Sequence, residues 1–179
     1  WQWALLVVGT EAAISEIKNS PLVKRWNHRA NESAIFDLAP ISSHGRWAKQ
    51  TPFTDETSEI RAPKNHTGQV AAITRARIKW SKNLTFWRAV PPVITELSKA
   101  PGLIAAIGIG EAPLGLQGTF SVWRDAQSLR NFAYKTVAHN DAITATKEIG
   151  WYSEELFARF SVLSATGSVN GIEVGHTAD

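Results

Sequence analysis

Two alternating periodicities of apolar residues run through the second half of the chain, and they limit its possible folds more than any other feature. Residues 70–80 place small or apolar side chains at every second position, a period of two that is typical of a strand. Residues 84–99 repeat apolar side chains at helical spacing, although Pro91 and Pro92 are expected to kink or restart that helix. The expected elements are, in order, a strand (70–80), a helix (84–99), two strands (103–109 and 119–123), a helix (125–149) and a strand (156–163).

This order of elements is the split βαβ or ferredoxin-like plan. The residues before it supply only part of a second such unit: a strand at 3–9, a helix capped by Thr10, a short helix at 22–31 and a strand at 33–38. Residues 39–69 show no sustained periodicity, and we interpret them as a long loop. We therefore divide the chain into a partial first half with its loop (1–69) and a second half (70–179), packed as one compact domain.

An antiparallel sheet with helices on one face leaves its other face bare, and two such sheets facing each other enclose a chamber. The predicted fold is thus α+β, with two ferredoxin-like halves of which the first is incomplete. Their antiparallel sheets are expected to form a domain of the dimeric α+β barrel type. Function is expected in the chamber between them.

Composition excludes several classes of site. The 179 residues contain no Cys, so disulfides, Cys-ligated zinc, iron–sulfur clusters and thiolate-ligated haem are excluded. A net charge of +3, with the basic residues scattered, disfavours nucleic acid as a partner. No apolar run is long enough to span a bilayer and no secretory signal is visible, which fits a cytoplasmic protein. The chain begins with Trp1 rather than Met, which favours a fragment or a processed form.

Eight Trp residues call for a large aromatic core or for a pocket walled by flat rings. His139 is the most interesting polar residue near such rings, because Leu129, Phe132, His139 and Ile143 fall in one stripe of the helix expected at 125–149. A neutral imidazole on an apolar helix face can ligate haem iron or another metal. A core histidine that donates to a carbonyl explains the same pattern. The other His residues lack the spacing of a helical zinc site.

Charged residues offer two further candidates. Arg75, Arg77 and Lys79 form a basic strip on one face of the strand at 70–80, which could meet carboxylates such as haem propionates or could be a solvated face. Glu154 and Glu155 project to opposite sides of a strand, and we interpret both as surface charge. The glycines between 108 and 118 lack the following helix that a nucleotide site needs.

Several segments spread over nearly the whole chain match one family in the same order. The longest is Trp-Tyr-Ser-Glu-Glu-Leu-Phe-Ala-Arg-Phe at 151–160. The others are 21–26 with 31–33, 45–47 with 52–53, 71–76 leading to 86–87, and 108–113 ahead of 119–123 and 125–126. Each segment alone is weak, but in this shared order they specifically resemble the spheroidene monooxygenases, the carotenoid ketolase family.

The resemblance implies a haem-containing monooxygenase that uses dioxygen and an external reductant such as ferredoxin to oxidise an apolar substrate, an acyclic carotenoid. It implies that His139 is the axial ligand of the iron. Trp-rich walls and an apolar helix face, including Trp123, Phe132 and Ile143, would enclose the macrocycle, and one of Arg75, Arg77 or Arg159 would pair with a propionate. A carotenoid substrate further implies loose peripheral contact with membrane lipid, and a homo-oligomer is compatible with the fold.

Other functions fit the same fold. A cofactor-free barrel of the antibiotic-biosynthesis monooxygenase type, or a small-molecule binding module, needs no haem and leaves His139 buried against a carbonyl. A different haem reaction, such as aldoxime dehydration or peroxide chemistry, also remains open.

Overall fold

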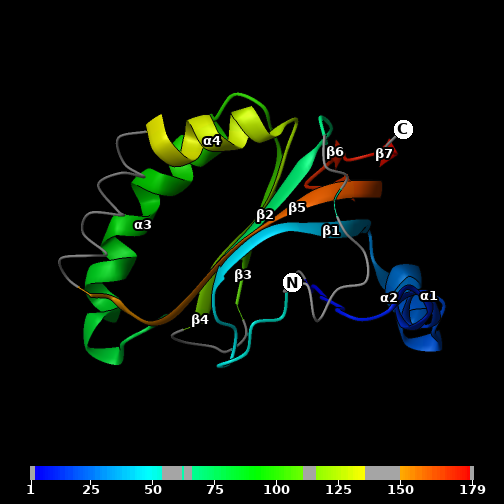
Figure 1. Cartoon of the computed structure of the whole chain (residues 1–179), viewed down its shortest axis with the longest axis horizontal. Helices are drawn as coiled ribbons and strands as arrows, with labels where there is room; N and C mark the ends of the chain where they lie inside the picture. The colour runs from blue at the N-terminus through cyan, green and yellow to red at the C-terminus, as the bar shows by residue number, and fades with distance from the viewer. Residues whose placement is uncertain (1–2, 54–61, 63–65, 111–115, 136–149, 178–179) are drawn as a thin grey trace.

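The computed structural model describes residues 3–53, 62, 66–110, 116–135 and 150–177 (Figure 1). Its helices are α1 (Glu11–Lys18), α2 (Pro21–Arg29), α3 (Asn83–Ser98) and α4 (Ala126–Lys135), with a short 3₁₀ turn, η1 (Trp80–Lys82), ahead of α3. Its strands are β1 (Ala34–Gly45), β2 (Val70–Ile78), β3 (Leu103–Ile109), β4 (Leu116–Trp123), β5 (Tyr152–Val169), β6 (Ile172–Glu173) and β7 (His176–Thr177). None of the described helices combines the length and the apolar character that crossing a bilayer requires.

The main sheet has the order β1-β5-β2-β4-β3, and its neighbouring strands are antiparallel. The second half alone therefore places its fourth strand beside its first, followed by its third and second, which is the ferredoxin-like arrangement. The first half adds β1 to the free edge of β5. The expected α+β class and the plan of the second half are confirmed.

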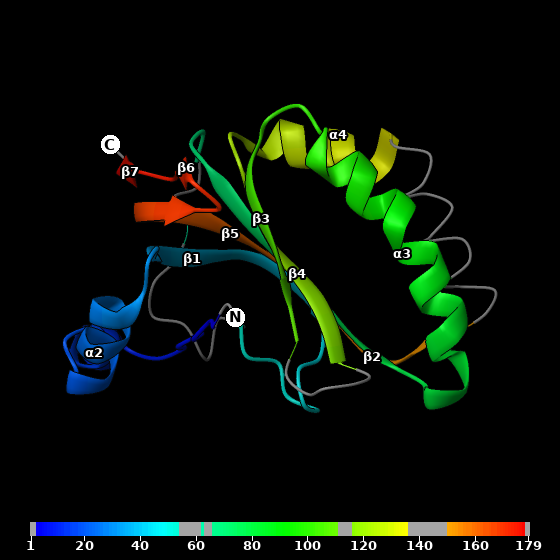
Figure 2. The ribbon, with the colours of Figure 1, turned by 180° about the vertical axis from the view of Figure 1, so that it is seen from behind.

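The register of these strands divides the sheet into two different faces. Val70 lies opposite Trp123, and both belong to one buried cluster with Leu129 and Phe132 of α4, so this face is the one covered by helices. Figures 1 and 2 show α3 and α4 together on that side of the sheet. Ala71 and Ile73 point the other way and join a separate core with Leu156, Phe160 and other residues of β5. We call these the helix face and the open face.

Two predictions about regular elements are corrected. Residues 3–9 do not form a strand: they pair with no described strand, and Trp3 is 82% exposed. A local pattern of Val and Leu cannot supply the neighbouring backbone that a strand needs. Pro91 and Pro92 do not restart the helix, since α3 runs through both, and both lie exposed, where solvent reaches the backbone that they leave unbonded.

Other boundaries also differ from expectation. β1 continues through Pro40 to Gly45, with register shifts on either side of the proline that remove the need for its missing N–H. The strand expected at 156–163 is longer than predicted, since β5 spans 18 residues.

The described part of the helix expected at 125–149 is α4. It is capped by Asp125, whose Oδ1 accepts a hydrogen bond from the Ser128 N–H at 2.7 Å. That bond is the main reason why the pKa of Asp125 falls to about 2, with help from the Ser128 hydroxyl and Arg124.

Gly45 provides a test of how closely β1 and β5 approach each other. Its φ is +89°, and an added Cβ would run into the backbone carbonyl of Glu155. We expect Gly45→Ala to lower the free energy of unfolding by about 3 kcal/mol, through both the left-handed backbone and the clash. Urea unfolding followed by circular dichroism measures the loss.

Gly171→Ala is the matched control, because Gly171 also has a positive φ (+76°) but no atom lies near the added Cβ. It should cost about 1 kcal/mol, the backbone penalty alone. Equal losses in the two variants would show that the close approach at Gly45 is unimportant.

Candidate functional site

The helix face holds an aromatic cluster built by β4 and α4. The rings of Trp123 and Phe132 lie 5.3 Å apart at an angle of 33°, and both side chains are buried. The Trp123 indole N–H donates to Ser121 Oγ at 3.0 Å, so its polar atom is satisfied within the protein. The cluster also contains Leu129 and is flanked by partly buried residues of α3 and the turn after it, Val93, Leu97 and Ala100. The structure thus brings together Trp123 and Phe132, two of the predicted cofactor-contacting residues.

A second aromatic cluster lies where α3 begins and β5 starts. Phe86 packs edge-on against Trp151, with ring centroids 5.8 Å apart, and lies 6.0 Å from the ring of Tyr152. Trp151 is only 2% exposed, and among the described residues its buried Nε1–H has no hydrogen-bond partner. Buried indole N–H groups are normally paired, so the acceptor of this one is a residue outside the described part of the chain, a water molecule or a bound group.

Flat rings, aliphatic side chains and one unpartnered buried donor on a single face suit an apolar prosthetic group that carries a polar edge. These residues therefore fit the haem that the sequence resemblance implies. The two other residues predicted to contact the cofactor, His139 and Ile143, lie outside the described residues.

Arg75 lies on the open face, because it is an odd number of residues from Val70 on the same strand. Its side chain is 2% exposed, Nη1 donates to Glu154 Oε1 at 2.9 Å, and its guanidinium lies 4.8 Å from the centre of the Trp47 ring. The interpretation of this position as part of a solvated face is therefore wrong. The guanidinium has a carboxylate partner in the protein, and it faces away from Trp123.

Glu154 is likewise not the surface charge that the sequence suggested, since its side chain is only 13% exposed. Besides Arg75, it accepts hydrogen bonds from the backbone N–H groups of Ala48, at 2.9 Å, and Lys49, at 2.7 Å. Both donors sit in a tight turn with positive φ, at +51° and +67°. The carboxylate thus fixes the turn after β1 to the open face.

Burial alone would raise the pKa of Glu154, but the Lys49 N–H, Arg75 and the Ala48 N–H together outweigh it and hold the pKa below its ordinary value. Glu154 is therefore ionised at neutral pH. The signal that reveals its burial is present in the sequence, because Glu154 has the same parity as Leu156 and Phe160 on the same strand.

The two other candidate arginines lie on different faces. Arg77 is exposed and shares the open face with Arg75. Arg159 pairs with Ala72, a residue of the helix-face cluster, so alternation places it on the same face as Trp123 and Phe132. It is half-buried and donates from Nε to Ser42 Oγ at 2.9 Å. Of the three arginines, Arg159 is the one that the structure places on the face of the aromatic clusters.

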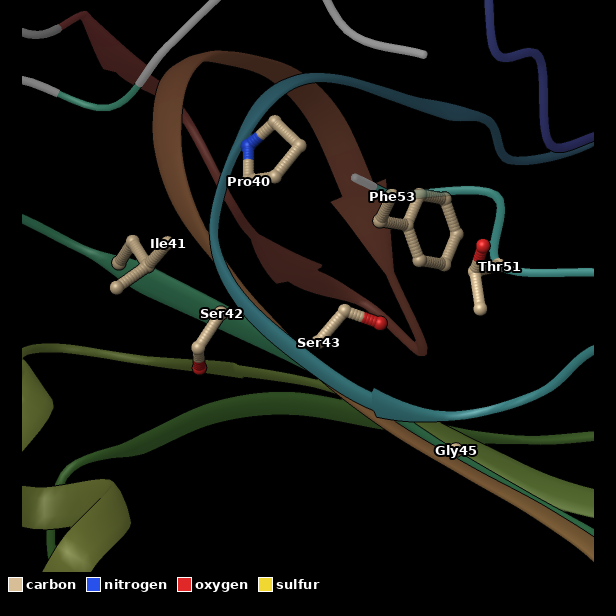
Figure 3. Close-up of a pocket in the computed structure, with 7 residues that line it drawn as sticks. All are labelled: Pro40, Ile41, Ser42, Ser43, Gly45, Thr51 and Phe53. Atoms are coloured by element: carbon tan, nitrogen blue, oxygen red, sulfur yellow. The ribbon is translucent and has the colours of Figure 1, made fainter. Parts of the chain in front are cut away.

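Two cavities adjoin β1 and the turn that follows it. The smaller, about 210 Å³, lies between β1 and the Thr51–Phe53 segment, where Phe53 packs edge-on against Phe160 at 4.9 Å. Figure 3 shows its lining residues, Pro40, Ile41, Ser42, Ser43, Gly45, Thr51 and Phe53. It falls below the roughly 300–1,000 Å³ that is typical of ligand pockets. The larger, about 570 Å³, has a charged lining: Gly45, Arg46, Lys49, Gly150, Tyr152, Ser153, Glu154 and Glu155.

The buried ion pair predicts that the two arginines of β2 contribute very differently to stability. Arg75→Leu leaves the Glu154 carboxylate buried without its cation, and we expect a loss of about 3 kcal/mol in the free energy of unfolding. Arg77→Leu, two residues away on the same face but exposed, should change it by less than about 0.5 kcal/mol. Chemical denaturation measures both losses in the free energy of unfolding. Equal losses in the two variants would contradict this account.

The lowered pKa of Glu154 predicts a pH dependence. A carboxyl group whose folded pKa lies below its ordinary value of 4.5 stabilises the protein above that pH, and this contribution disappears as the pH falls through the folded value. The stability difference between the wild type and Glu154→Gln should therefore be constant at neutral pH and shrink below pH 4.5. Glu155→Gln, at the exposed neighbouring residue, is the control for the removal of one carboxylate charge from this strand.

A solved structure of a Fusobacterium nucleatum protein is similar to this chain over 94% of its length and over 70% of the other chain, with a TM-score of 0.53 and 15% identity. At that identity the likeness concerns the fold alone. Together with the strand order, it supports the expected barrel-type α+β fold.

No family model matches the sequence. The spheroidene monooxygenase of Rhodobacter capsulatus is 39% identical over 171 residues, which cover 94% of this chain and 70% of the relative. The spheroidene monooxygenase of Cereibacter sphaeroides is 36% identical over 172 residues, and there the chain spans about half of the relative, 52%. That of Rubrivivax gelatinosus is 36% identical, with 60% of the relative covered. The chain belongs to the spheroidene monooxygenase family.

Proposed function

We propose that the protein is a haem-dependent monooxygenase that oxidises an acyclic carotenoid with dioxygen and an external reductant such as ferredoxin. The observation that carries this proposal is the 39% identity with a spheroidene monooxygenase across 94% of the chain. Family membership supports the oxidoreductase class and an apolar substrate of the carotenoid type. Haem, the reductant and the particular carotenoid rest on the chemistry of the site.

The helix face is the proposed haem site. Haem, when bound, supplies the activation of dioxygen. Trp123 and Phe132 provide flat apolar walls, and Trp151 offers a polar edge its indole N–H, which has no partner in the described part of the chain. His139 is the proposed iron ligand, since it follows Leu129 and Phe132 at helical spacing and both of these face the sheet.

Arg159 is the proposed partner of a propionate, because it shares this face and its guanidinium retains donors beyond the one bonded to Ser42. Arg75 instead positions the turn that closes the open face, through Glu154. Apolar walls also exclude water from the substrate, which protects the oxidising chemistry from side reactions.

Two assembly features belong to the same proposal. An acyclic carotenoid resides in membranes, so the enzyme makes peripheral contact with lipid. A fold of the dimeric α+β barrel type pairs two sheets around a chamber, so a homo-oligomer is part of the same proposal.

The proposed haem site predicts a spectroscopic difference between two histidine variants. The protein expressed with haem supply should show a Soret band at roughly 400–420 nm, the range of His-ligated haem. His139→Ala should abolish or shift this band, because it removes the axial ligand. His44→Ala, at an exposed histidine near the end of β1, is the matched control and should leave the band unchanged.

Absence of the band from both the wild type and the His44→Ala variant would contradict the haem site. If the band survives His139→Ala unshifted, another residue ligates the iron. Conversion of an acyclic carotenoid in detergent, with a reduced ferredoxin and dioxygen, then tests the substrate and the reductant separately from haem binding.

A further inference from the structure

One end of the molecule exposes two large apolar side chains that are four residues apart in the sequence. Trp80 in η1 is 73% exposed and Leu84 in the first turn of α3 is 66% exposed. Phe86, two residues further on, turns inward and packs against Trp151, so the exposed pair lies on the outer side of α3. An exposed indole beside an exposed leucine is an unfavourable surface in water unless something covers it.

Cationic side chains from several segments lie at the same end as this pair. Arg46, Lys49, Arg77, Lys79 and Arg88 are exposed, and Lys82 is half-buried. Among the described residues of these segments, the acids are Glu154, whose charge is already paired with Arg75, and the exposed Glu155. The described part of this end therefore carries an excess of positive charge.

These residues come from separate segments that the fold brings to one end. The Lys79 N–H donates to the Trp151 carbonyl at 2.8 Å, and the larger cavity is lined by Arg46 and Lys49 on one side and by Gly150 and Tyr152 on the other. In both Figure 1 and Figure 2 the start of α3 and the turn after β1 lie at the lower end of the molecule. We call this surface, defined by Arg46, Lys49, Lys79, Trp80, Lys82 and Leu84, the basic end.

We propose that the basic end docks onto an anionic lipid surface, with Trp80 and Leu84 entering the interface and the lysines and arginines contacting lipid phosphates. The proposal rests on the proposed function in one respect, which is that an apolar substrate is drawn from a bilayer. Indole rings favour the level of the headgroups, and Lys and Arg side chains reach anionic headgroups while their stems cover apolar surface.

The position of the basic end links docking to the site. Phe86, Trp151 and Tyr152 lie directly behind it, and they form the beginning of the aromatic lining of the helix face. A membrane that contacts Trp80 and Leu84 therefore lies next to this aromatic side of the site. An apolar molecule that leaves the membrane there meets aromatic rather than charged residues.

Helix α2 offers a competing surface of similar composition. Leu22 and Trp26 are also four residues apart and exposed, and Lys24 and Arg25 lie between them. Their exposed fractions are lower, 45% and 39%, and no aromatic cluster with an unpartnered buried donor lies behind them among the described residues. This similarity makes α2 a suitable matched control.

The test is co-sedimentation of the full chain with extruded vesicles of phosphatidylcholine containing about one third phosphatidylglycerol, compared with pure phosphatidylcholine. The wild type should bind the anionic vesicles and should be released by high salt, because the cationic contribution is screened. Trp80→Ala with Leu84→Ala should weaken binding by about tenfold or more. Lys79→Gln with Lys82→Gln should weaken it on the order of tenfold and reduce its salt dependence.

Leu22→Ala with Trp26→Ala should bind like the wild type, and circular dichroism should show all variants folded, since every altered side chain is exposed or half-buried. Loss of binding in the α2 variant, with retention in the Trp80 and Leu84 variant, would overturn the assignment. So would equal binding to neutral and anionic vesicles, or no binding at all.

Failure of this proposal can be told apart from failure of the proposed function. Vesicle binding is measured without turnover, while oxidation of a carotenoid is measured in detergent without vesicles. If the Lys79 and Lys82 variant binds vesicles normally but loses only ferredoxin-driven turnover, the basic end contacts an acidic redox protein instead of lipid, and the docking proposal is wrong.

Discussion

The pairing of β5 along both of its edges is the constraint on which the rest of the structure depends. This strand forms one ladder with β1 and another with β2, and so joins the first part of the chain to the ferredoxin-like half. Because both edges are hydrogen-bonded, β5 cannot rotate or slip by one residue without exchanging its two faces. Leu156 and Phe160 are thereby fixed on the open face and Arg159 on the helix face.

The two faces then acquire different chemistry. The open face buries a charge, and it tolerates Glu154 because two backbone N–H groups and Arg75 replace the water that the carboxylate loses. The helix face stays apolar and aromatic, and its described polar side chains include the Trp151 indole N–H without a partner. The proposed haem site uses the helix face for this reason, while the charges of the open face position the turn after β1.

Much of the fold was predictable because it depends on local pattern. The period of two in residues 70–80 and the helical spacing after Leu84 gave β2 and α3 within a few residues of their observed bounds. The prediction of a strand at 3–9 was wrong because Val and Leu residues favour a strand only where a neighbouring strand can pair with it. The burial of Phe132 followed from the apolar stripe of its helix, whereas its packing against Trp123 was seen only in the structure.

Alternation along a strand specifies which residues share a face, so the sequence by itself determined that Arg75 and Arg77 lie together and that Glu154 and Glu155 point apart. It could not determine that Arg75 is buried and Arg77 exposed, or that Glu154 receives the backbone of residues 48 and 49. Glu154 lies more than 100 residues from that turn in the sequence, and Arg75 lies 79 residues from Glu154. Only the tertiary structure decided them, because burial and hydrogen bonding depend on which distant segment covers a face, and a pattern of residue types carries no record of that contact.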